Sequence, residues 1–155
     1  MIIKEFTEEY RSIFLDLCRD FYESHAAIKG FDRAIADTTF SRVLDHHENL
    51  WGVMLLAIED GEPLGYALIT SYWCNEEGGN VIVLDELYIR KDMRQKGYAK
   101  MFMQWLENAY ADKAVAVTLE VLTTNQHARD LYIKSGYRPD GFTTYSKPLR
   151  HGPEG

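Results

Sequence analysis

The segment from residue 81 to residue 122 constrains the fold more than any other part of the chain. Residues 81–89 are almost entirely apolar and predict a strand, and a basic stretch that contains a glycine follows at 90–100. Apolar residues at helical spacing over 99–109 predict an amphipathic helix, and 115–122 predicts a second strand. Because this segment has the form of a crossover, we expect these two strands to be parallel, with a right-handed connection. The chain therefore contains a β-α-β crossover.

The remaining elements surround this crossover. Apolar periodicity and turn residues predict, in chain order, a strand at 1–6, helices at about 10–21 and at 32–46, strands at 51–58 and 64–73, a helix at 125–135 and a strand at 143–149. Thr7 is positioned to cap the first helix, and Asp60-Gly61 is a hairpin turn signal. Pro148 marks the last strand as an edge or a strand end. This order predicts an α/β fold with a mixed sheet.

Length and composition are typical of one globular domain. With 155 residues and 46% apolar side chains the chain can bury a core, so we expect one domain at 1–150 and a disordered tail at 151–155. No apolar stretch reaches the roughly 20 residues that a membrane-spanning helix needs, and the N-terminus is mixed and acidic, unlike a secretory signal. Cys18 and Cys74 cannot form a disulfide framework. We therefore expect reduced thiols and a cytoplasmic protein that does not bind membranes.

Charge is distributed unevenly along the chain. The net charge of −7 argues against nucleic-acid binding, which requires a basic face. Residues 1–89 hold 6 basic and 17 acidic side chains, whereas 90–100 hold five basic and one acidic. The short basic segment indicates a local anion site, and the acidic part favours a cationic partner. The alternative is that both segments are merely solvated surface.

The basic segment lies where the strand ends and the helix begins. The first turn of a helix leaves backbone N–H groups unpaired and carries partial positive charge. Gly97 lets the backbone approach an anion closely, and Arg94, Lys96 and Lys100 add positive charge at the same point. A phosphate-rich ligand is the expected occupant. Neither the Walker spacing GxxxxGK[ST] nor the dinucleotide fingerprint GxGxxG is present.

Two motifs in this order resemble those of the GNAT superfamily of acyl-CoA-dependent N-acetyltransferases. The sequence RQKGYA at 94–99 resembles the family's R/Q-x-x-G-x-G/A phosphate loop, and 125–137 resembles its N-x-x-A-x-x-x-Y-x-x-x-G-F segment, with Tyr137 in place of Phe. The resemblance covers about residues 50–150. It implies a mixed, largely antiparallel central sheet with helices on both faces and a parallel crossover at the acyl-CoA site. It also implies that acetyl-CoA is the acyl donor.

Asp85 and Glu86 interrupt the apolar strand with two adjacent carboxylates. Alternation sends one to each face, and a local bulge would bring both toward one opening. Burial raises the pKa of a carboxylate, as a general base near neutral pH requires. The alternative is a structural salt bridge to a neighbouring element. In the family an acidic residue on this strand accepts the amine proton, and some polyamine and aminosugar acetyltransferases carry the pair in the reverse order. We favour Glu86 over Asp85.

The resemblance also implies roles for other residues. The cofactor-binding positions that it implies are Leu87, Tyr88, Ile89, Arg94, Gln95, Lys96, Gly97, Tyr98, Ala99, Lys100, Asn125 and Tyr132. Within this set, Leu87 and Ile89 offer backbone groups to the pantetheine arm, as an added strand does. Asn125 contacts the cofactor arm or orders the loop before the last helix. Tyr132 protonates the departing thiolate, unless it is an ordinary core aromatic.

The remaining expectations concern the acceptor and partners. We expect a small-molecule or peptide amine, cationic if the acidic field attracts it, and a homodimer is compatible with exposed sheet edges. The five histidines are scattered and no HExxH or CxxC occurs, so we expect no metal. The alternative function is a non-catalytic acyl-CoA sensor, which would need neither a base nor an acid.

Overall fold

The computed structural model describes residues 1–47 and 49–149. Five strands form one sheet in the order β1-β2-β3-β4-β5. The strands are β1 (Ile2–Glu5), β2 (Leu50–Leu56), β3 (Pro63–Cys74), β4 (Gly79–Ile89) and β5 (Ala116–Leu119). The first four are antiparallel, and β4 pairs with β5 in parallel through helix α3 (Tyr98–Tyr110). The predicted α/β fold, its largely antiparallel sheet and its crossover are confirmed.

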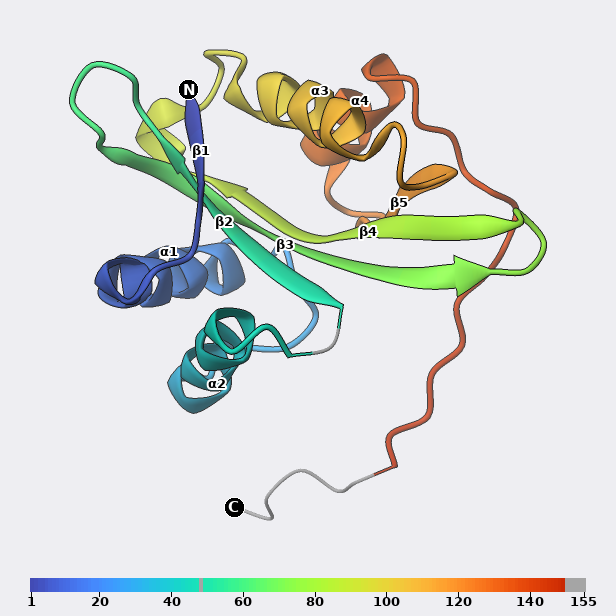
Figure 1. Ribbon diagram of the computed structural model, residues 1–155, viewed down its shortest axis with the longest axis horizontal. Coiled ribbons are helices and arrows are strands. Elements are labelled where there is room, and N and C mark those ends of the chain that lie inside the picture. Colours follow the sequence, from blue (N-terminus) through green and yellow to red (C-terminus); the bar gives the residue numbers. More distant parts are fainter. Residues whose placement is uncertain (48, 150–155) are drawn as a thin grey trace.

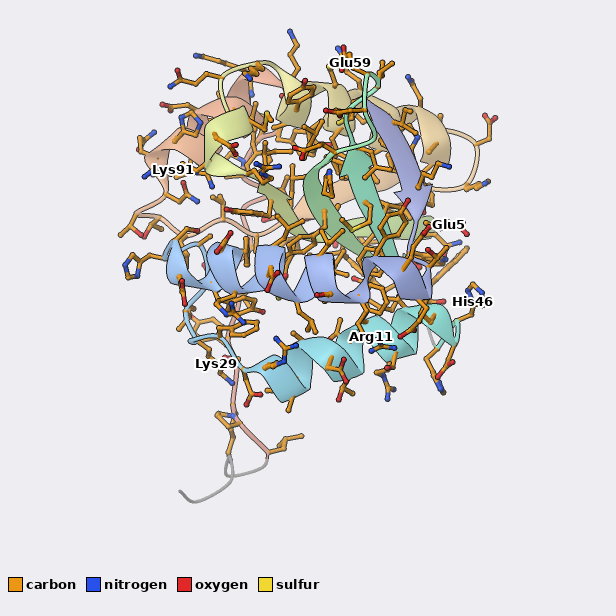
Figure 2. All side chains as sticks on the ribbon, turned by 90° about the vertical axis from the view of Figure 1, so that its left-hand side faces the viewer. Glu5, Arg11, Lys29, His46, Glu59 and Lys91 are labelled. Carbon is orange, nitrogen blue, oxygen red and sulfur yellow. The ribbon has the colours of Figure 1, made fainter. Side chains whose placement is uncertain are left out.

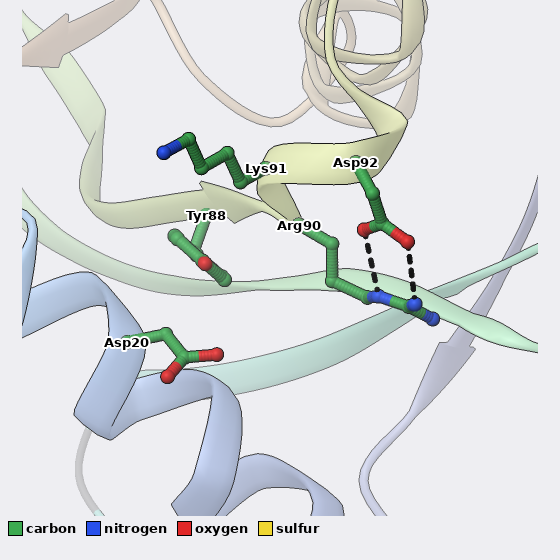
Figure 3. A pocket seen from close by; sticks show the side chains of 5 residues that line it. All are labelled: Asp20, Tyr88, Arg90, Lys91 and Asp92. Carbon is green, nitrogen blue, oxygen red and sulfur yellow. Dashed lines mark hydrogen bonds and ion pairs between the residues drawn. The ribbon is translucent and has the colours of Figure 1, made fainter.

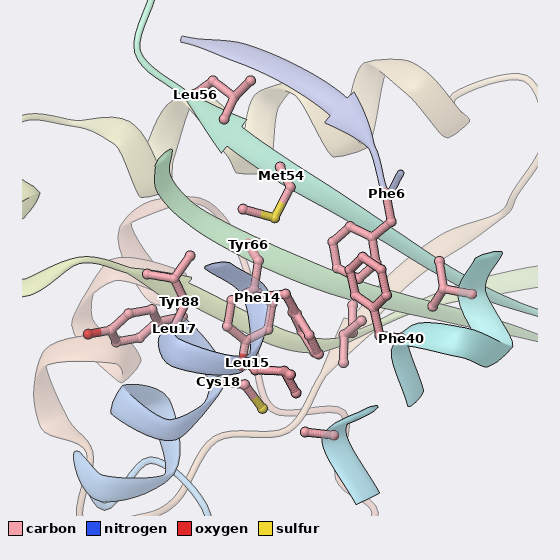
Figure 4. Close-up of a cluster of buried hydrophobic side chains, with 13 residues drawn as sticks. Phe6, Phe14, Leu15, Leu17, Cys18, Phe40, Met54, Leu56, Tyr66 and Tyr88 are labelled. Atoms are coloured by element: carbon pink, nitrogen blue, oxygen red, sulfur yellow. The ribbon is translucent and has the colours of Figure 1, made fainter. Parts of the chain in front are cut away.

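Helices cover both faces of the sheet (Figure 1). Helices α1 (Arg11–Glu23) and α2 (Arg33–Leu44) lie on one face, and α3 and α4 (Gln126–Lys134) lie on the other. Each face has its own apolar cluster. The α1 cluster contains stacked and tilted aromatic rings, among them Phe6 and Phe40 with centroids 4.6 Å apart (Figure 4). The α3 cluster is built around Phe102, Met103 and Leu106.

Local sequence explains where the first two helices begin. A 3-10 turn, Glu8–Tyr10, precedes α1, and the Thr7 hydroxyl donates to Glu9 Oε1 at 3.1 Å instead of accepting a backbone N–H. The predicted Thr7 cap is therefore wrong, because the tight turn takes the place of the first helical turn. Asp32 does cap α2, accepting from the N–H groups of Ala34 and Ile35.

The two helices are linked on their outer side. Arg11 of α1 reaches Asp37 of α2 at 2.8 Å and Ser41 at 3.0 Å, and Figure 2 shows the helices side by side with Arg11 between them. The link holds α1 and α2 together, and α1 supplies residues to the site described below. None of the helices within the described ranges is both long and apolar enough to traverse a bilayer.

The C-terminal prediction of a strand at 143–149 is wrong. This segment has no regular structure and its side chains are exposed. A strand needs a partner for its backbone groups, and within the described ranges no strand pairs with it. β5 is also shorter than the predicted 115–122. The predicted disordered tail at 151–155 lies outside the described residues.

Candidate functional site

β4 carries a β-bulge at its acidic pair. In the register between β3 and β4, Glu86 lies opposite Leu68. Leu84 lies opposite Ile69, the next residue of β3, so that Asp85 is left without a partner. One extra residue inverts the alternation of a strand. Leu84 therefore packs in the α3 cluster, whereas Glu86 faces α1.

The Glu86 carboxylate is held by two tyrosine hydroxyls. Tyr66 Oη from β3 donates to Oε1 at 2.7 Å, and Tyr22 Oη from α1 donates to Oε2 at 2.9 Å. Burial raises the pKa of Glu86, the two hydroxyls lower it, and nearby Asp85 raises it, with a net rise above the ordinary value. Glu86 is thus a fixed carboxylate that is more basic than an exposed glutamate.

The tyrosine and cysteine side chains packed around this carboxylate are uncharged at neutral pH. Tyr66 is fully buried, and its hydroxyl contacts the Cys18 thiol of α1 as well as Glu86. Burial, assisted by the charge of Glu86, raises the pKa of Cys18 to about 12, so the thiol stays protonated at neutral pH. Burial also raises the pKa values of Tyr22 and Tyr66. Both tyrosines therefore remain hydrogen-bond donors.

Asp85 has a different environment. It is the extra residue of the bulge, and its side chain is exposed. Desolvation by the surrounding protein is the main reason why the pKa of Asp85 is raised. The negative charge of Glu120, just beyond β5, raises it further. The structure therefore separates the two acids: Glu86 is oriented by hydrogen bonds, and among the described residues Asp85 has no hydrogen-bonding side chain to orient it.

The β5 side of β4 is open beyond Leu84. Residues 81–84 pair with β5, which ends at Leu119. Within the described part of the chain no strand pairs with 85–89 on that side. The crossover therefore leaves backbone groups of β4 exposed next to the bulge, where an extended ligand can add as a strand.

Backbone alternation identifies the groups at this opening. The Arg90 N–H donates to the Leu64 carbonyl of β3 at 2.8 Å, so the N–H and C=O groups of Leu87 and Ile89 point away from β3. The Ile89 carbonyl accepts Arg94 Nε at 2.9 Å. Leu87 keeps both of its groups for a ligand, whereas Ile89 keeps only its N–H. The Tyr88 side chain lies on the α1 face, like that of Glu86.

The basic loop presents free N–H groups at the start of α3. Gln95 and Gly97 have positive φ angles of 62° and 83°. The Met101 N–H makes the first helical hydrogen bond, to Gly97 O at 3.0 Å, which leaves the earlier N–H groups of the turn free. A Cβ at Gly97 would meet no atom within 4 Å, so the space before the turn is open. Tyr98 and Ala99 turn inward against the α3 cluster.

Three cations surround this turn. The Arg94 guanidinium lies 5.5 Å from the Tyr88 ring centroid, and Lys96 and Lys100 are exposed. Among the residues that the structure describes, no carboxylate lies within ion-pair distance of these three. Arg90, by contrast, is paired with two acidic side chains at 3.2 and 2.8 Å. The loop therefore combines unneutralised charge with backbone donors, which suits a phosphate.

Helix α4 places Tyr132 in the α3 cluster, on the face of the sheet opposite Glu86. Burial raises the pKa of Tyr132, so its hydroxyl holds its proton at neutral pH. The Tyr132 hydroxyl makes no hydrogen bond to a described residue. Every fully buried side-chain oxygen in those ranges has a hydrogen-bond partner, so the Tyr132 hydroxyl must be exposed to solvent. Asn125 Oδ1 accepts the Ala128 N–H at 3.2 Å and caps α4. This cap orders the start of α4. A contact of Asn125 with the cofactor arm stays a prediction.

A hollow of about 530 Å³ opens on the α1 face beside Tyr88 (Figure 3). Its lining includes Asp20 of α1 and Lys91, and among the described residues neither has an ion-pair partner. Not all acidic residues of the segment 1–89 lie near this hollow. Glu76 and Glu77 lie in the turn between β3 and β4, at the opposite end of β4 from the basic loop (Figure 1).

Sequence reasoning missed the two tyrosines that hold Glu86. A signal was available for Tyr66, since a tyrosine within an apolar central strand needs a partner for its hydroxyl. Tyr22 follows the apolar stripe of the first helix, and only the packing of α1 on β4 shows its partner. In the described ranges no group of three or more His, Cys, Asp or Glu side chains could hold a metal ion.

The family model described as the acetyltransferase (GNAT) family matches residues 6–137. Two curated proteins are similar to this chain. A D-amino-acid N-acetyltransferase of Saccharomyces cerevisiae is 27% identical over 108 residues, which are 68% of this chain and 66% of the yeast protein. An uncharacterized N-acetyltransferase of Bacillus subtilis is 27% identical over 129 residues, which are 82% of this chain and 81% of that protein.

A solved structure has the same fold. An aminoglycoside N-acetyltransferase in complex with CoA superposes with a TM-score of 0.77 and 13% sequence identity. The match covers 96% of this chain and 95% of that one. At this identity the likeness concerns the fold.

Proposed function

The chain belongs to the acetyltransferase (GNAT) family, and from this premise we propose that it transfers an acetyl group from acetyl-CoA to a primary amine by direct attack in a ternary complex. One observation carries the proposal. Glu86, with a raised pKa, is held by two tyrosines at a bulge beside the open edge of β4. A base fixed next to an open strand edge is what amine deprotonation requires.

Acetyl-CoA is a substrate in this proposal, and the chain has groups that suit each part of it. The turn from Arg94 to Lys100 receives the pyrophosphate with its free N–H groups and cations. The Leu87 carbonyl and the Ile89 N–H receive the pantetheine arm as an added strand. Asn125 contributes by ordering the start of α4. The acetyl thioester is thereby directed toward the bulge.

The chemistry then uses three groups of this chain. Glu86 takes a proton from the amine, directly or through water, and the amine nitrogen attacks the thioester carbonyl carbon. The Leu87 N–H stabilises the negative charge that develops on the carbonyl oxygen. When the carbon–sulfur bond breaks, the Tyr132 hydroxyl donates its proton to the thiolate. An amide and free CoA leave the site.

A covalent acyl-enzyme is not part of this proposal. Cys18 is buried beneath Tyr66, and its raised pKa keeps it in the thiol form, which is a poor nucleophile. The half-buried Cys74 lies at the end of β3, next to the turn that joins β3 to β4, at the opposite end of β4 from the basic loop. Direct attack by the amine needs neither thiol.

The acceptor is proposed to be a small cationic amine. The hollow is lined by Tyr88, which lies two residues along β4 from Glu86, and by the Asp20 carboxylate of α1. The first 89 residues hold many more acidic than basic side chains, which favours a cation over an anion.

The rival function, a non-catalytic acyl-CoA sensor, explains the phosphate turn but not the acidic pair. A sensor gains nothing from a partly buried carboxylate that two hydroxyls hold in place, because removing a carboxylate from water is unfavourable. The deciding experiment is an acetyl-CoA turnover screen over polyamines, aminosugars, amino acids and peptide amines, read as release of free CoA. Turnover with at least one amine class supports the enzyme. CoA binding with no turnover in any class favours the sensor.

Gly97→Glu is expected to weaken acetyl-CoA binding strongly. The new Cβ meets no atom within 4 Å, but the substitution places a negative charge where phosphate belongs and puts a side chain at a φ of 83°. Isothermal titration with CoA measures the effect. Gly97→Asn, which tolerates positive φ and carries no charge, is the matched control and should retain most of the affinity. Unchanged affinity in a folded Gly97→Glu variant would remove the pyrophosphate from this turn.

The proposed cationic acceptor has a salt signature. For matched cationic and neutral amines, we expect kcat/KM to favour the cation at low ionic strength and the preference to shrink as salt screens the acidic surface. Asp20→Asn should reduce the same preference, and Glu76→Asn, at the far end of β4, should not. A preference for the neutral amine that does not change with salt contradicts the acceptor class and leaves acetyl transfer intact.

A further inference from the structure

The hollow beside Tyr88 contains one free charge of each sign. Its lining comes from α1, from the end of β4 and from the 3-10 turn Lys91–Met93 that follows β4. Asp20 and Lys91 are exposed, and within the described ranges neither lies within ion-pair distance of an opposite charge. The hollow therefore offers one anionic and one cationic group to a ligand.

The other charged side chains of the lining are paired with each other. The Arg90 guanidinium donates to both carboxylate oxygens of Asp92, at 3.2 and 2.8 Å. In Figure 3 the Lys91 side chain extends away from this pair, toward the side on which Tyr88 and Asp20 lie. A ligand of the hollow therefore finds its free charges at Asp20 and Lys91.

Tyr88 lies between these charges and the proposed base. Its side chain and that of Glu86 lie on the same face of β4, two residues and about 7 Å apart along the strand. Burial raises the pKa of Tyr88 and the nearby Asp20 charge raises it further, so the Tyr88 hydroxyl stays protonated close to that carboxylate. Lys91 follows Tyr88 three residues later in the chain, and Glu86 lies outside the lining of the hollow. The free charges are thus set apart from Glu86.

This separation defines the shape of an acceptor that occupies the hollow. If one nitrogen reacts at Glu86, the charged groups that bind in the hollow must lie at the opposite end of the molecule. A carboxylate suits Lys91 and an ammonium group suits Asp20, and the head group of an α-amino acid carries both on one carbon atom. The hollow, at about 530 Å³, has the size of a small-molecule site. A short methylene chain would then join the head group to the reacting amine.

We propose that the acceptor is a diamino acid of the lysine type, whose α-ammonium and carboxylate groups bind Asp20 and Lys91 and whose terminal amine is acetylated at Glu86. The inference rests on the proposed function and specifies its acceptor. The bond from the terminal nitrogen to the acetyl carbon forms and the carbon–sulfur bond breaks. The proton that the neutral amine gives to Glu86 is balanced by the proton that Tyr132 gives to the thiolate.

Three acceptors with the same spacing of groups separate the two contacts. Lysine carries both charged groups, cadaverine lacks the carboxylate, and aminocaproate lacks the α-ammonium group. Release of free CoA gives kcat/KM for each, and NMR of the product identifies the acetylated nitrogen. We expect the wild type to prefer lysine over each of the other two by about tenfold, the contribution of one hydrogen-bonded charge, and to acetylate its terminal nitrogen.

Two substitutions assign the contacts to their residues. Lys91→Gln should remove the preference for lysine over cadaverine, and Asp20→Asn should remove the preference for lysine over aminocaproate. The matched control is Lys113→Gln, which removes the same charge from the exposed turn after α3 and should keep both preferences. Titration of Lys91→Gln with CoA should give the wild-type affinity, because Lys91 binds the acceptor in this proposal.

Each contrary outcome has one meaning. Equal use of lysine and cadaverine by the wild type, acetylation of the α-nitrogen, or a loss of CoA affinity in Lys91→Gln overturns the inference and leaves acetyl transfer intact. Efficient use of Nα-acetyl-lysine amide, which carries neither charge, also overturns it and points to a lysine within a peptide. If lysine is inert while another amine class is acetylated, only this inference fails. If no amine class is acetylated, the proposed function fails with it.

Discussion

Glu86→Gln is expected to lower kcat for acetyl transfer by about 10²–10⁴-fold, the usual contribution of a general base, while CoA binding is unchanged. The amide matches the carboxylate in shape and keeps an oxygen acceptor for Tyr66 or Tyr22, so the fold should be preserved. It cannot take a proton from the amine. Steady-state turnover together with CoA titration measures both effects. Wild-type turnover in the variant would assign the base elsewhere.

The same variant should lose part of its pH dependence. Because burial raises the pKa of Glu86, activity should fall as pH drops through that raised value and the carboxylate becomes protonated. With one acceptor used throughout, the ionisation of the amine is common to all variants. The acid limb, which is the fall in activity at low pH caused by protonation of Glu86, is therefore expected in the wild type and should be absent from Glu86→Gln.

Two neighbouring substitutions serve as controls with opposite signs. The Tyr22 hydroxyl lowers the pKa of Glu86, so Tyr22→Phe should move the acid limb to higher pH. The Asp85 charge raises that pKa, so Asp85→Asn should move the limb to lower pH and retain turnover. Shifts in the same direction would show that the limb does not report Glu86. A loss of turnover in Asp85→Asn as large as in Glu86→Gln would give Asp85 a direct role.

Tyr132→Phe is the second substitution with a large expected effect. Only the hydroxyl is removed, and it bonds no described residue, so the packing of α4 should persist. Loss of a general acid is expected to lower kcat by about 10²–10⁴-fold with little change in acetyl-CoA affinity. Single-turnover kinetics, in which the chemical step is observed directly, is the appropriate measurement.

Tyr137→Phe is the matched control for this substitution. Its ring lies 6.1 Å from that of Tyr132, and its hydroxyl bonds Glu107 of α3, so it shares the cluster but not the proposed role. It should retain turnover. If Tyr132→Phe reacts at the wild-type rate, Tyr132 is a core aromatic and another proton donor serves the thiolate. If both variants lose activity equally, the cause is the packing of α4.

The sequence by itself determined most of the fold. The crossover at 81–122 indicated a parallel pair within an otherwise antiparallel sheet, since two neighbouring strands can be parallel only when a long connection such as a helix joins them. Apolar periodicity placed the helices, and Asp32 and Asn125 gave the starts of two of them through their capping oxygens. The basic loop at 90–100 could also be predicted as an anion site from the sequence, because Gly97 and the start of α3 are adjacent in the chain.

Only the tertiary structure decided how the acidic pair is arranged. Which face receives Glu86 depends on one unpaired residue in the register of β3 against β4. The acidic pair indicated a bulge as one of two possibilities, but the local sequence does not say which residue is left unpaired. The tyrosines that hold the carboxylate come from α1 and β3, 64 and 20 residues away in the chain. The fate of 143–149 was decided in the same way, since a strand-forming sequence becomes a strand only where an edge is available to it. Local sequence fixes the conformations that a segment favours, whereas pairing and burial, which depend on distant residues, select the one it adopts.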